Sequence, residues 1–255
     1  MVSYVLKLKG DERLDYLVTD ESMNIIQSPT IFSYSMDALL LANFTYVPIK
    51  KGNLLDLCTG NGIIPLLLSK RTYGNIYGLE IQDRLADMAV RSVKLNNLTN
   101  QINIIKGDLK LPQTELQQSG FDVVTCNPPY FKTPNDNEKN KNEHLTIARH
   151  EVCCTLEDVI KACKLYVRPG GKVALVHRPG RLVDILSLMR TYNLEPKRLQ
   201  FVYSKAGRQA IMILIEGVRD GKADLNILPP LYLYNEDDTY TEETKEIIYG
   251  LKTRR

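Results

Sequence analysis

The segment Asn127-Pro128-Pro129-Tyr130 contains the residue types needed to hold a planar amine. The two prolines fix the backbone after an apolar run and prevent a helix from continuing there. The side-chain oxygen of Asn127 and the carbonyl of Pro128 can then accept the two hydrogens of an NH₂ group on a π-system. Accepting both would draw the nitrogen lone pair out of conjugation, so that it becomes a nucleophile. Tyr130 offers a ring on which a base can stack, a contact worth about 1–3 kcal/mol in nucleic-acid complexes.

A glycine-containing segment, Asp56-Leu57-Cys58-Thr59-Gly60-Asn61-Gly62, follows an earlier apolar run. Its two glycines let the backbone turn tightly and approach a ligand without a Cβ in the way. The amides that open the next helix can meet a polar ligand. Pro65 stands where the third glycine of a dinucleotide-binding loop would be, and there is no Gly-Lys-Ser/Thr of a Walker loop. Taken alone, the segment fits an ordinary turn as well as a ligand-binding loop.

Two acidic residues follow the next two apolar runs. Glu80 comes eighteen residues after Gly62, and a carboxylate there can accept both hydroxyls of a ribose. Asp108, or the backbone beside it, can contact an adenine amine. Each acid by itself is also compatible with a solvated charge or a turn residue. Because parallel strands end at one edge of a sheet, we expect all these segments to meet there.

Together the segments resemble the class I S-adenosylmethionine-dependent methyltransferases, over roughly residues 53–217. The resemblance implies S-adenosylmethionine as cofactor and no metal, with Asn127, Pro128, Pro129 and Tyr130 as the catalytic motif and Asn127 also beside the cofactor. The residues expected to contact its methionine part are Asp56, Thr59, Gly60, Asn61 and Gly62. Those expected at its ribose and adenine are Glu80, Ile81, Asp108 and Leu109.

The whole chain also resembles the bacterial tRNA adenine-N6 methyltransferases that modify an adenine beside the anticodon of a valine tRNA. The similar segments are FSYSMDALLL (32–41), NPPYF (127–131), ARHE (148–151) and LPPL (228–231). The resemblance implies a tRNA partner, bound through its anticodon stem-loop. Ser35 and Asp37 are expected to cap a helix and face the methionine end of the cofactor, or to be a plain helix cap. Arg149 and His150 are candidates for a phosphate or base contact, and residues 132–144 for a lid or a plain loop.

Two other classes of methyltransferase carry a similar motif, because guanine N2 and the glutamine side-chain amide are planar amines too. Enzymes that methylate protein glutamine usually have a large helical domain before the catalytic one. Only 52 residues precede the first regular strand here, and they have a strand-like pattern. A non-catalytic RNA-binding or protein-interaction module on the same fold is a further alternative. The intact motif beside an intact glycine loop argues against it.

The apolar periodicity predicts the elements that position these residues. Strands are expected at 53–57, 75–80, 102–106, 121–126 and 172–177, and helices at 62–70, 83–97, 155–167 and 182–191. Their alternation predicts an α/β fold with a Rossmann-like, doubly wound, mostly parallel sheet. Strands at 199–203 and 209–216, joined by a short turn, predict an antiparallel edge. We expect a strand-rich N-terminal extension over 1–45, with a hairpin and a short helix at 36–44, and a methyltransferase domain with a C-terminal tail over 46–255.

Composition excludes several classes of protein. The chain has 255 residues, of which 44% are hydrophobic and 25% charged, as in ordinary globular domains. No apolar run is long enough to span a bilayer, and the charged N-terminus does not resemble a signal peptide, which predicts a cytoplasmic protein. The five cysteines lack the spacing of a zinc site or a disulfide framework. Residues 161–215 hold eleven Lys and Arg against two acids, whereas residues 231–250 hold six acids against one lysine. This asymmetry favours a polyanionic partner or marks a solvated face.

Overall fold

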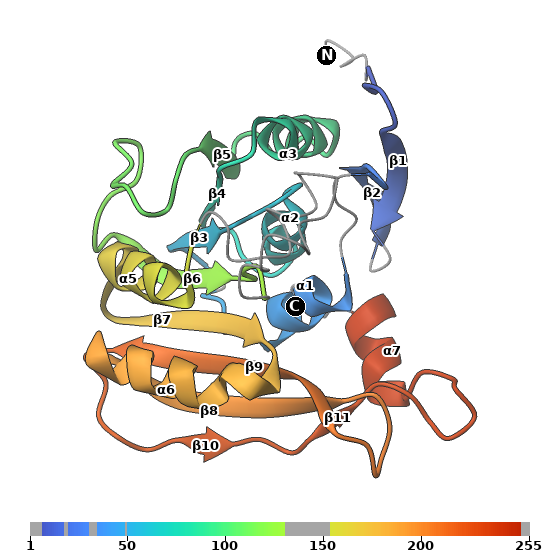
Figure 1. Cartoon of the computed structure of the whole chain (residues 1–255). Helices are drawn as coiled ribbons and strands as arrows, with labels where there is room; N and C mark the ends of the chain where they lie inside the picture. The colour runs from blue at the N-terminus through green and yellow to red at the C-terminus, as the bar shows by residue number, and fades with distance from the viewer. Residues whose placement is uncertain (1–6, 18–19, 31–34, 49, 131–153, 251–255) are drawn as a thin grey trace, which may run out of the picture.

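A nine-stranded sheet forms the centre of the computed structural model, which describes residues 7–17, 20–30, 35–48, 50–130 and 154–250. Its strands are β3 (Asn53–Leu57), β4 (Asn75–Glu80), β5 (Ile102–Lys106), β6 (Phe121–Cys126), β7 (Val167–His177), β8 (Leu194–Tyr203), β9 (Ala210–Arg219), β10 (Asn226–Ile227) and β11 (Leu231–Tyr232). Their spatial order is β10-β8-β9-β7-β6-β3-β4-β5, with β11 also paired to β8 (Figure 1). The doubly wound, mostly parallel sheet predicted from the sequence is therefore confirmed.

One strand, β9, runs against the others. It pairs antiparallel with both β7 and β8, so that β8 itself runs parallel to β7. The antiparallel strand is thus placed inside the sheet, whereas the sequence predicted it at the edge. The chain turns back after β8 and fills the space between β8 and β7. The edge beyond β8 is covered by β10 and β11, two strands of two residues each that are too short to show a periodicity.

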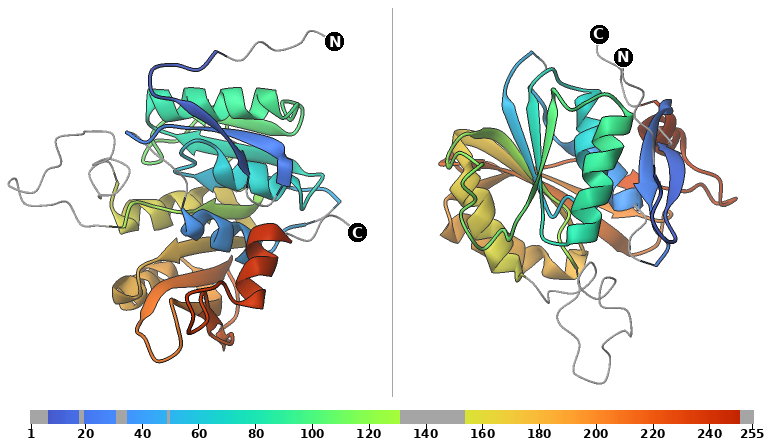
Figure 2. Two further views of the ribbon diagram at one scale, coloured as in Figure 1. Left: turned by 90° about the vertical axis from the view of Figure 1, so that its right-hand side faces the viewer. Right: turned by 90° about the horizontal axis from the view of Figure 1, so that it is seen from above.

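Helices cover both faces of the sheet (Figures 1 and 2). One face carries α1 (Met36–Phe44), α2 (Ile63–Ser69), α3 (Asp83–Leu95) and α7 (Glu242–Tyr249), and the other carries α5 (Leu156–Tyr166) and α6 (Leu182–Thr191). The strands β3 to β9 each contribute apolar side chains to both layers, as buried strands do. None of the helices in the described part of the chain is long and apolar enough to cross a membrane.

The boundary between α5 and β7 shows how the local sequence sets the elements. The Thr155 hydroxyl accepts a hydrogen bond from the Asp158 N–H at 3.2 Å, and the Asp158 carboxylate accepts one from the Thr155 N–H at 2.9 Å. This reciprocal cap fixes the first turn of α5. β7 begins directly after the helix because Val167 pairs with Phe121 of β6. It is therefore longer than the predicted strand, which began at Lys172.

The N-terminal strands β1 (Arg13–Leu17) and β2 (Asp20–Gln27) form a separate antiparallel hairpin, as expected. This hairpin packs on α3, where Ile26 meets Leu85 and Met88. The Arg91 guanidinium donates to both carboxylate oxygens of Glu12, at 2.8 and 2.7 Å, and both side chains are buried. The start of the hairpin is thereby joined to α3, one of the helices that cover the main sheet. The division of the chain at residue 45 stays a prediction.

Candidate active site

The strand order reverses between β3 and β6, and the candidate residues lie at the carboxyl ends of the strands around this point. Ligands of open α/β sheets bind at such a reversal. Asp56 near the end of β3 stands opposite Thr125 of β6, whose hydroxyl donates to Asp56 Oδ1 at 2.7 Å. The glycine loop and the Asn-Pro-Pro-Tyr motif therefore begin on two neighbouring strands.

The glycine loop after β3 has an unusual backbone. Cys58, Gly60 and Gly62 all have positive φ angles, of 56°, 58° and 86°. At Gly62 a Cβ would also lie 3.1 Å from the Cβ of Ala89 in α3. Glycine is therefore required at this position both for its backbone angle and for the close approach of α2 to α3.

Glu80, at the end of β4, closes the next side of the site. Its Oε2 accepts a hydrogen bond from the Gly60 N–H at 2.8 Å, and its Oε1 accepts one from the Gln82 N–H at 2.9 Å. Burial raises the pKa of Glu80, while these backbone donors act in the opposite direction. Ile81, the next residue, is 36% exposed and offers an apolar surface beside the carboxylate. Glu80 therefore lies against the glycine loop, while its expected contact with a ribose stays a prediction.

Three buried side-chain oxygens of the loop, Asp56 Oδ2, Thr59 Oγ1 and Asn61 Oδ1, make no hydrogen bond of normal distance and angle among the described residues. Thr59 nevertheless lies close enough to Asp56 to act on the pKa of that carboxyl. The three side chains are 0%, 2% and 0% exposed, and the Asn61 amide nitrogen is taken by the carbonyl of Ile26 at 3.0 Å. Burial raises the pKa of Asp56 to about 7. Unpaired buried polar groups are destabilising and rare. Their concentration in one loop fits a polar ligand with hydrogens to donate, such as an amino group.

The remaining predicted ligand contacts lie around this loop. Asp108 is half-buried and accepts the Lys110 N–H at 2.9 Å, and Leu109 is buried. Ser35 is the N-cap residue of α1, but its side chain makes no capping hydrogen bond, which contradicts the expected cap. Burial and, after it, the nearby carboxylate of Asp37 in the first turn of α1 raise the pKa of Tyr130.

The motif after β6 is held by its own tyrosine. The Tyr130 hydroxyl donates to Asn127 Oδ1 at 2.5 Å. The Tyr130 ring lies 5.2 Å from the imidazole of His177 and 5.5 Å from the guanidinium carbon of Arg178, measured from the ring centre. Burial raises the pKa of Tyr130, so its hydroxyl keeps its proton. The side-chain oxygen expected to receive an amine is therefore already a hydrogen-bond acceptor in this structure.

His177 is a site residue that the sequence did not reveal. It ends β7, is 1% exposed and packs against Tyr130. Its Nδ1 accepts the Arg178 N–H at 2.8 Å, while Nε2 is buried and has no partner among the described residues. Burial lowers the pKa of His177 to about 4, so the ring is neutral and Nε2 carries its hydrogen at pH 7. A polar residue closing an apolar strand beside the motif strand was the available signal.

The basic stretch of 161–215 is largely neutralised in the fold. Lys172 and Arg198 both pair with Glu216, at 3.4 and 3.3 Å, and Lys205 pairs with Asp238 at 2.8 Å. Arg208, in the turn between β8 and β9, is exposed, and its side chain has no ion pair or hydrogen bond within the described residues. This turn lies at the same edge of the sheet as His177, because β8 and β7 run parallel.

Several candidates fall outside the described residues. These are Arg149, His150, residues 132–144 and residues 32–34.

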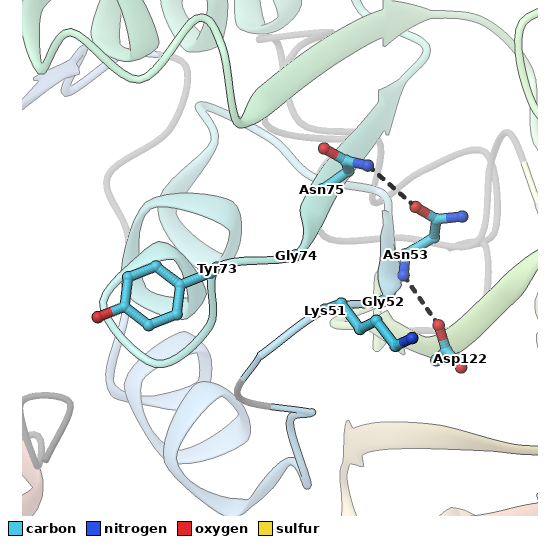
Figure 3. Close-up of a pocket in the computed structure, with 7 residues that line it drawn as sticks. All are labelled: Lys51, Gly52, Asn53, Tyr73, Gly74, Asn75 and Asp122. Atoms are coloured by element: carbon cyan, nitrogen blue, oxygen red, sulfur yellow. Dashed lines mark hydrogen bonds between the residues drawn. The ribbon is translucent and has the colours of Figure 1, made fainter.

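A pocket of about 390 Å³ lies at the opposite edge of the sheet, near the amino ends of β3, β4 and β6 (Figure 3). Its Asn53, Asn75 and Asp122 side chains are hydrogen-bonded within the pocket wall, so it does not resemble the reactive edge. Among the described residues no three His, Cys, Asp or Glu side chains are grouped to hold a metal ion.

Residues 22–183 match the methyltransferase small domain family. The chain belongs to this family. Relatives of this methyltransferase include two proteins named tRNA1(Val) (adenine(37)-N6)-methyltransferase. The one from Bacteroides fragilis is 23% identical over 82% of this chain and 88% of its own length. The one from Porphyromonas gingivalis is 30% identical over 64% of each chain.

Solved structures support the methyltransferase fold. A protein from Agrobacterium tumefaciens, described as a predicted O-methyltransferase, superposes with a TM-score of 0.67 over 86% of this chain and 98% of its own. The two share 18% of their residues. At that identity the similarity concerns the fold alone.

Proposed function

We propose that this methyltransferase uses S-adenosylmethionine to methylate the exocyclic N6 of an adenine in tRNA, in the anticodon stem-loop and in the cytoplasm. The observation that carries the proposal is the position of Asn127 and Pro128. They follow β6 at the reversal of strand order, on the strand next to the loop with three unpaired polar atoms. Donor and acceptor sites on adjacent strands fit a group transfer between two bound molecules.

The loop and its neighbours fit the cofactor. The oxygens of Asp56, Thr59 and Asn61 that lack a hydrogen bond fit the amino group of its methionine part. We assign the ribose hydroxyls to Glu80, because its carboxylate lies against the same loop. We assign the adenine ring to the apolar side chains of Ile81 and Leu109, which follow the ends of β4 and β5. When bound, S-adenosylmethionine supplies a methyl carbon already activated by a positively charged sulfur. The protein then has to position the acceptor for in-line attack.

The motif residues would hold the target amine. Asn127 Oδ1 and the Pro128 carbonyl accept its two hydrogens and orient its lone pair. The Tyr130 ring supports the plane of the base, and His177 lies behind it with an unused Nε2–H donor. No strong base is required before transfer, since the methylated ammonium loses a proton readily.

The choice of adenine in tRNA rests on the named relatives. A base within a loop must be turned out of its stack to reach such a site, and unpaired anticodon-loop bases require less free energy for this than duplex bases. Guanine N2 and glutamine are the alternatives that an experiment must separate.

Nucleoside mass spectrometry tests the proposal directly. Bulk bacterial tRNA lacking the modification is incubated with the wild-type protein and S-adenosylmethionine, then digested and analysed. N6-methyladenosine is expected, and its formation should vanish with the Asn127→Ala variant, which controls for contaminating enzymes. N2-methylguanosine, or methylation of a release factor without any tRNA product, would overturn the adenine assignment.

A further inference from the structure

We propose that strand β2 of the N-terminal hairpin positions Asn61 for the cofactor, and that Ser92 of α3 is the positioning residue that holds this strand in place. The inference rests on the proposed function in one respect, the assignment of Asn61 Oδ1 to the amino group of the cofactor. It adds the hairpin, which carries none of the expected ligand contacts, to the parts of the chain that determine cofactor affinity.

In the two-stranded sheet of the hairpin, the edge of β2 opposite β1 bonds to side chains. Asn24 and Ile26 are alternate residues of β2, so their N–H and C=O groups point to the same edge of the strand. The Asn24 N–H donates to Asn96 Oδ1 at 2.9 Å, and the Asn24 carbonyl accepts a hydrogen bond from Asn96 Nδ2 at 2.7 Å. The Asn96 side chain therefore takes the place of a paired strand residue.

Ile26 continues this edge and bonds to two different segments. Its N–H donates to Ser92 Oγ at 3.0 Å, and its carbonyl accepts a hydrogen bond from Asn61 Nδ2, also at 3.0 Å. Ile26, Asn61 and Ser92 are each 0% exposed. Ser92 lies four residues before Asn96, on the same face of α3. The helix thus fixes the strand, and the strand in turn fixes Asn61 in the glycine loop.

The bond to Ile26 decides which way the Asn61 amide points. A carbonyl oxygen can only accept a hydrogen bond, so the group that faces Ile26 is the NH₂ of Asn61. Its Oδ1 is therefore directed elsewhere, and this buried oxygen makes no hydrogen bond among the described residues. A flipped amide would set two oxygens against each other and would offer N–H groups to an ammonium, which can only donate. The orientation that Ile26 imposes is the one that suits an amino group.

Two routes connect α3 to the glycine loop. The direct route is the close approach of Gly62 to Ala89, where a Cβ on the glycine would lie 3.1 Å from that of the alanine. The second route passes from Ser92 through Ile26 to Asn61, because the hairpin lies along α3 (Figure 2). Loosening the second route alone should free the Asn61 amide while the loop backbone stays in place. A side chain that is already oriented loses less conformational entropy when a ligand binds.

Binding measurements with two ligands separate this role from a general loss of structure. S-adenosylhomocysteine carries the amino acid part of the cofactor, whereas methylthioadenosine lacks it. Ser92→Ala should raise the Kd for S-adenosylhomocysteine by about fivefold, because the Ile26 N–H loses its acceptor and Asn61 loses its fixed support. The Kd for methylthioadenosine should stay within about twofold, since this ligand has no group for Asn61. Isothermal titration calorimetry measures both constants.

A double-mutant cycle tests whether the effect passes through Asn61. Asn61→Ala should raise the Kd for S-adenosylhomocysteine by about tenfold. In that background Ser92→Ala should change the same Kd by less than about twofold, because no amide is left to position. Ser69→Ala removes another buried hydroxyl, at the last residue of α2. It is the matched control and should bind both ligands as the wild-type protein does.

Equal losses of affinity for the two ligands, the same loss from Ser92→Ala with and without Asn61, or no loss at all would overturn the proposal. An unchanged Kd for S-adenosylhomocysteine in Asn61→Ala would instead overturn the assignment of Asn61 to the cofactor. Circular dichroism shows whether each variant is folded. If Ser92→Ala does not fold, Ser92→Cys replaces it in the cycle, since a thiol of similar shape is a weaker acceptor. These measurements do not depend on which amine the protein methylates.

Discussion

The backbone N–H of Gly60 donates a 2.8 Å hydrogen bond to Oε2 of Glu80. This bond joins the loop after β3 to the acid that ends β4, so the two proposed cofactor contacts are one structural unit. The other carboxylate oxygen of Glu80, Oε1, accepts a hydrogen bond from the Gln82 N–H. Its carboxylate is thus oriented before any ligand arrives.

Removing this carboxylate should weaken cofactor binding. We expect Glu80→Ala to raise the Kd for S-adenosylmethionine by about ten- to a hundredfold, since hydrogen bonds to a charged group contribute about 1.5–3 kcal/mol. Isothermal titration calorimetry measures the change. Glu242→Ala, at an exposed carboxylate in α7, is the control and should bind normally. An unchanged Kd for Glu80→Ala would remove Glu80 from the site.

The amine-binding role of Asn127 predicts a separation of binding from turnover. Asn127→Ala should reduce methyl transfer by at least about a hundredfold, because acceptor groups placed for the transition state contribute on that scale. Cofactor affinity should stay within about threefold, since the carboxamide is assigned mainly to the amine. Single-turnover assays and calorimetry measure the two quantities. A variant with wild-type turnover would show that the motif has another task.

The buried carboxyl of Asp56 should make stability depend on pH. Its folded-state pKa of about 7 lies above the ordinary value of 3.8 because the group is buried. The folded protein therefore holds a proton that the unfolded chain has lost, and stability falls as pH rises from about 4 to about 7. The asparagine of Asp56→Asn does not titrate. The free energy of unfolding of this variant, minus that of wild type, should therefore increase by up to about 4 kcal/mol as pH rises from about 4 to about 7.

Urea unfolding of both proteins at several pH values measures this gain. Groups other than Asp56 titrate in both proteins and cancel in the comparison. A difference that does not change with pH would mean that Asp56 is ionised in the folded state throughout.

Gly62 should tolerate alanine poorly for two separable reasons. Its φ of 86° is unfavourable for alanine, and a Cβ would press on Ala89 at 3.1 Å. We expect Gly62→Ala to lower the free energy of unfolding by about 2–3 kcal/mol. Gly207 also has a positive φ, but a Cβ there would meet no other atom. At Gly180 a Cβ would likewise meet no other atom, and its φ is not positive. The free energy of unfolding should fall by about 1 kcal/mol in Gly207→Ala and by almost nothing in Gly180→Ala. Equal effects at Gly62 and Gly207 would show that α3 yields to the new methyl group.

The ion pairs within residues 161–215 indicate that Arg208, rather than Lys205, should contact a tRNA phosphate. Lys205 is held by Asp238 at 2.8 Å and by the Glu236 carbonyl at 2.9 Å, whereas Arg208 is exposed. Arg208→Glu should weaken tRNA binding and lower the slope of log K against log salt by about 0.7–0.9 for the lost phosphate contact. Lys205→Glu should do less. Fluorescence anisotropy at several salt concentrations measures both slopes, and a larger effect at Lys205 would contradict this order.

Local patterns in the sequence predicted the central strands and the helix α5, because buried strands and helix faces leave a periodic signal of apolar residues. The ends of β7 and the place of β9 depend on pairing with distant strands, which no local pattern records. Two-residue strands such as β10 have no period at all. In the same way, Asp56, Glu80 and the motif could be recognised by type and spacing. The proximity of Asp37 to Tyr130 and the burial of His177 arise only when remote segments pack together.

The inserted position of β9 also has a consequence for synthesis on the ribosome. Residues 35–177 contain every residue of the candidate site, yet β7 has no partner on its outer side until residues 210–219 emerge. A nascent chain at that stage presents an open strand edge next to apolar side chains, which invites pairing with other chains. Chains interrupted before residue 210 should therefore aggregate or require a chaperone, although they carry the whole catalytic motif.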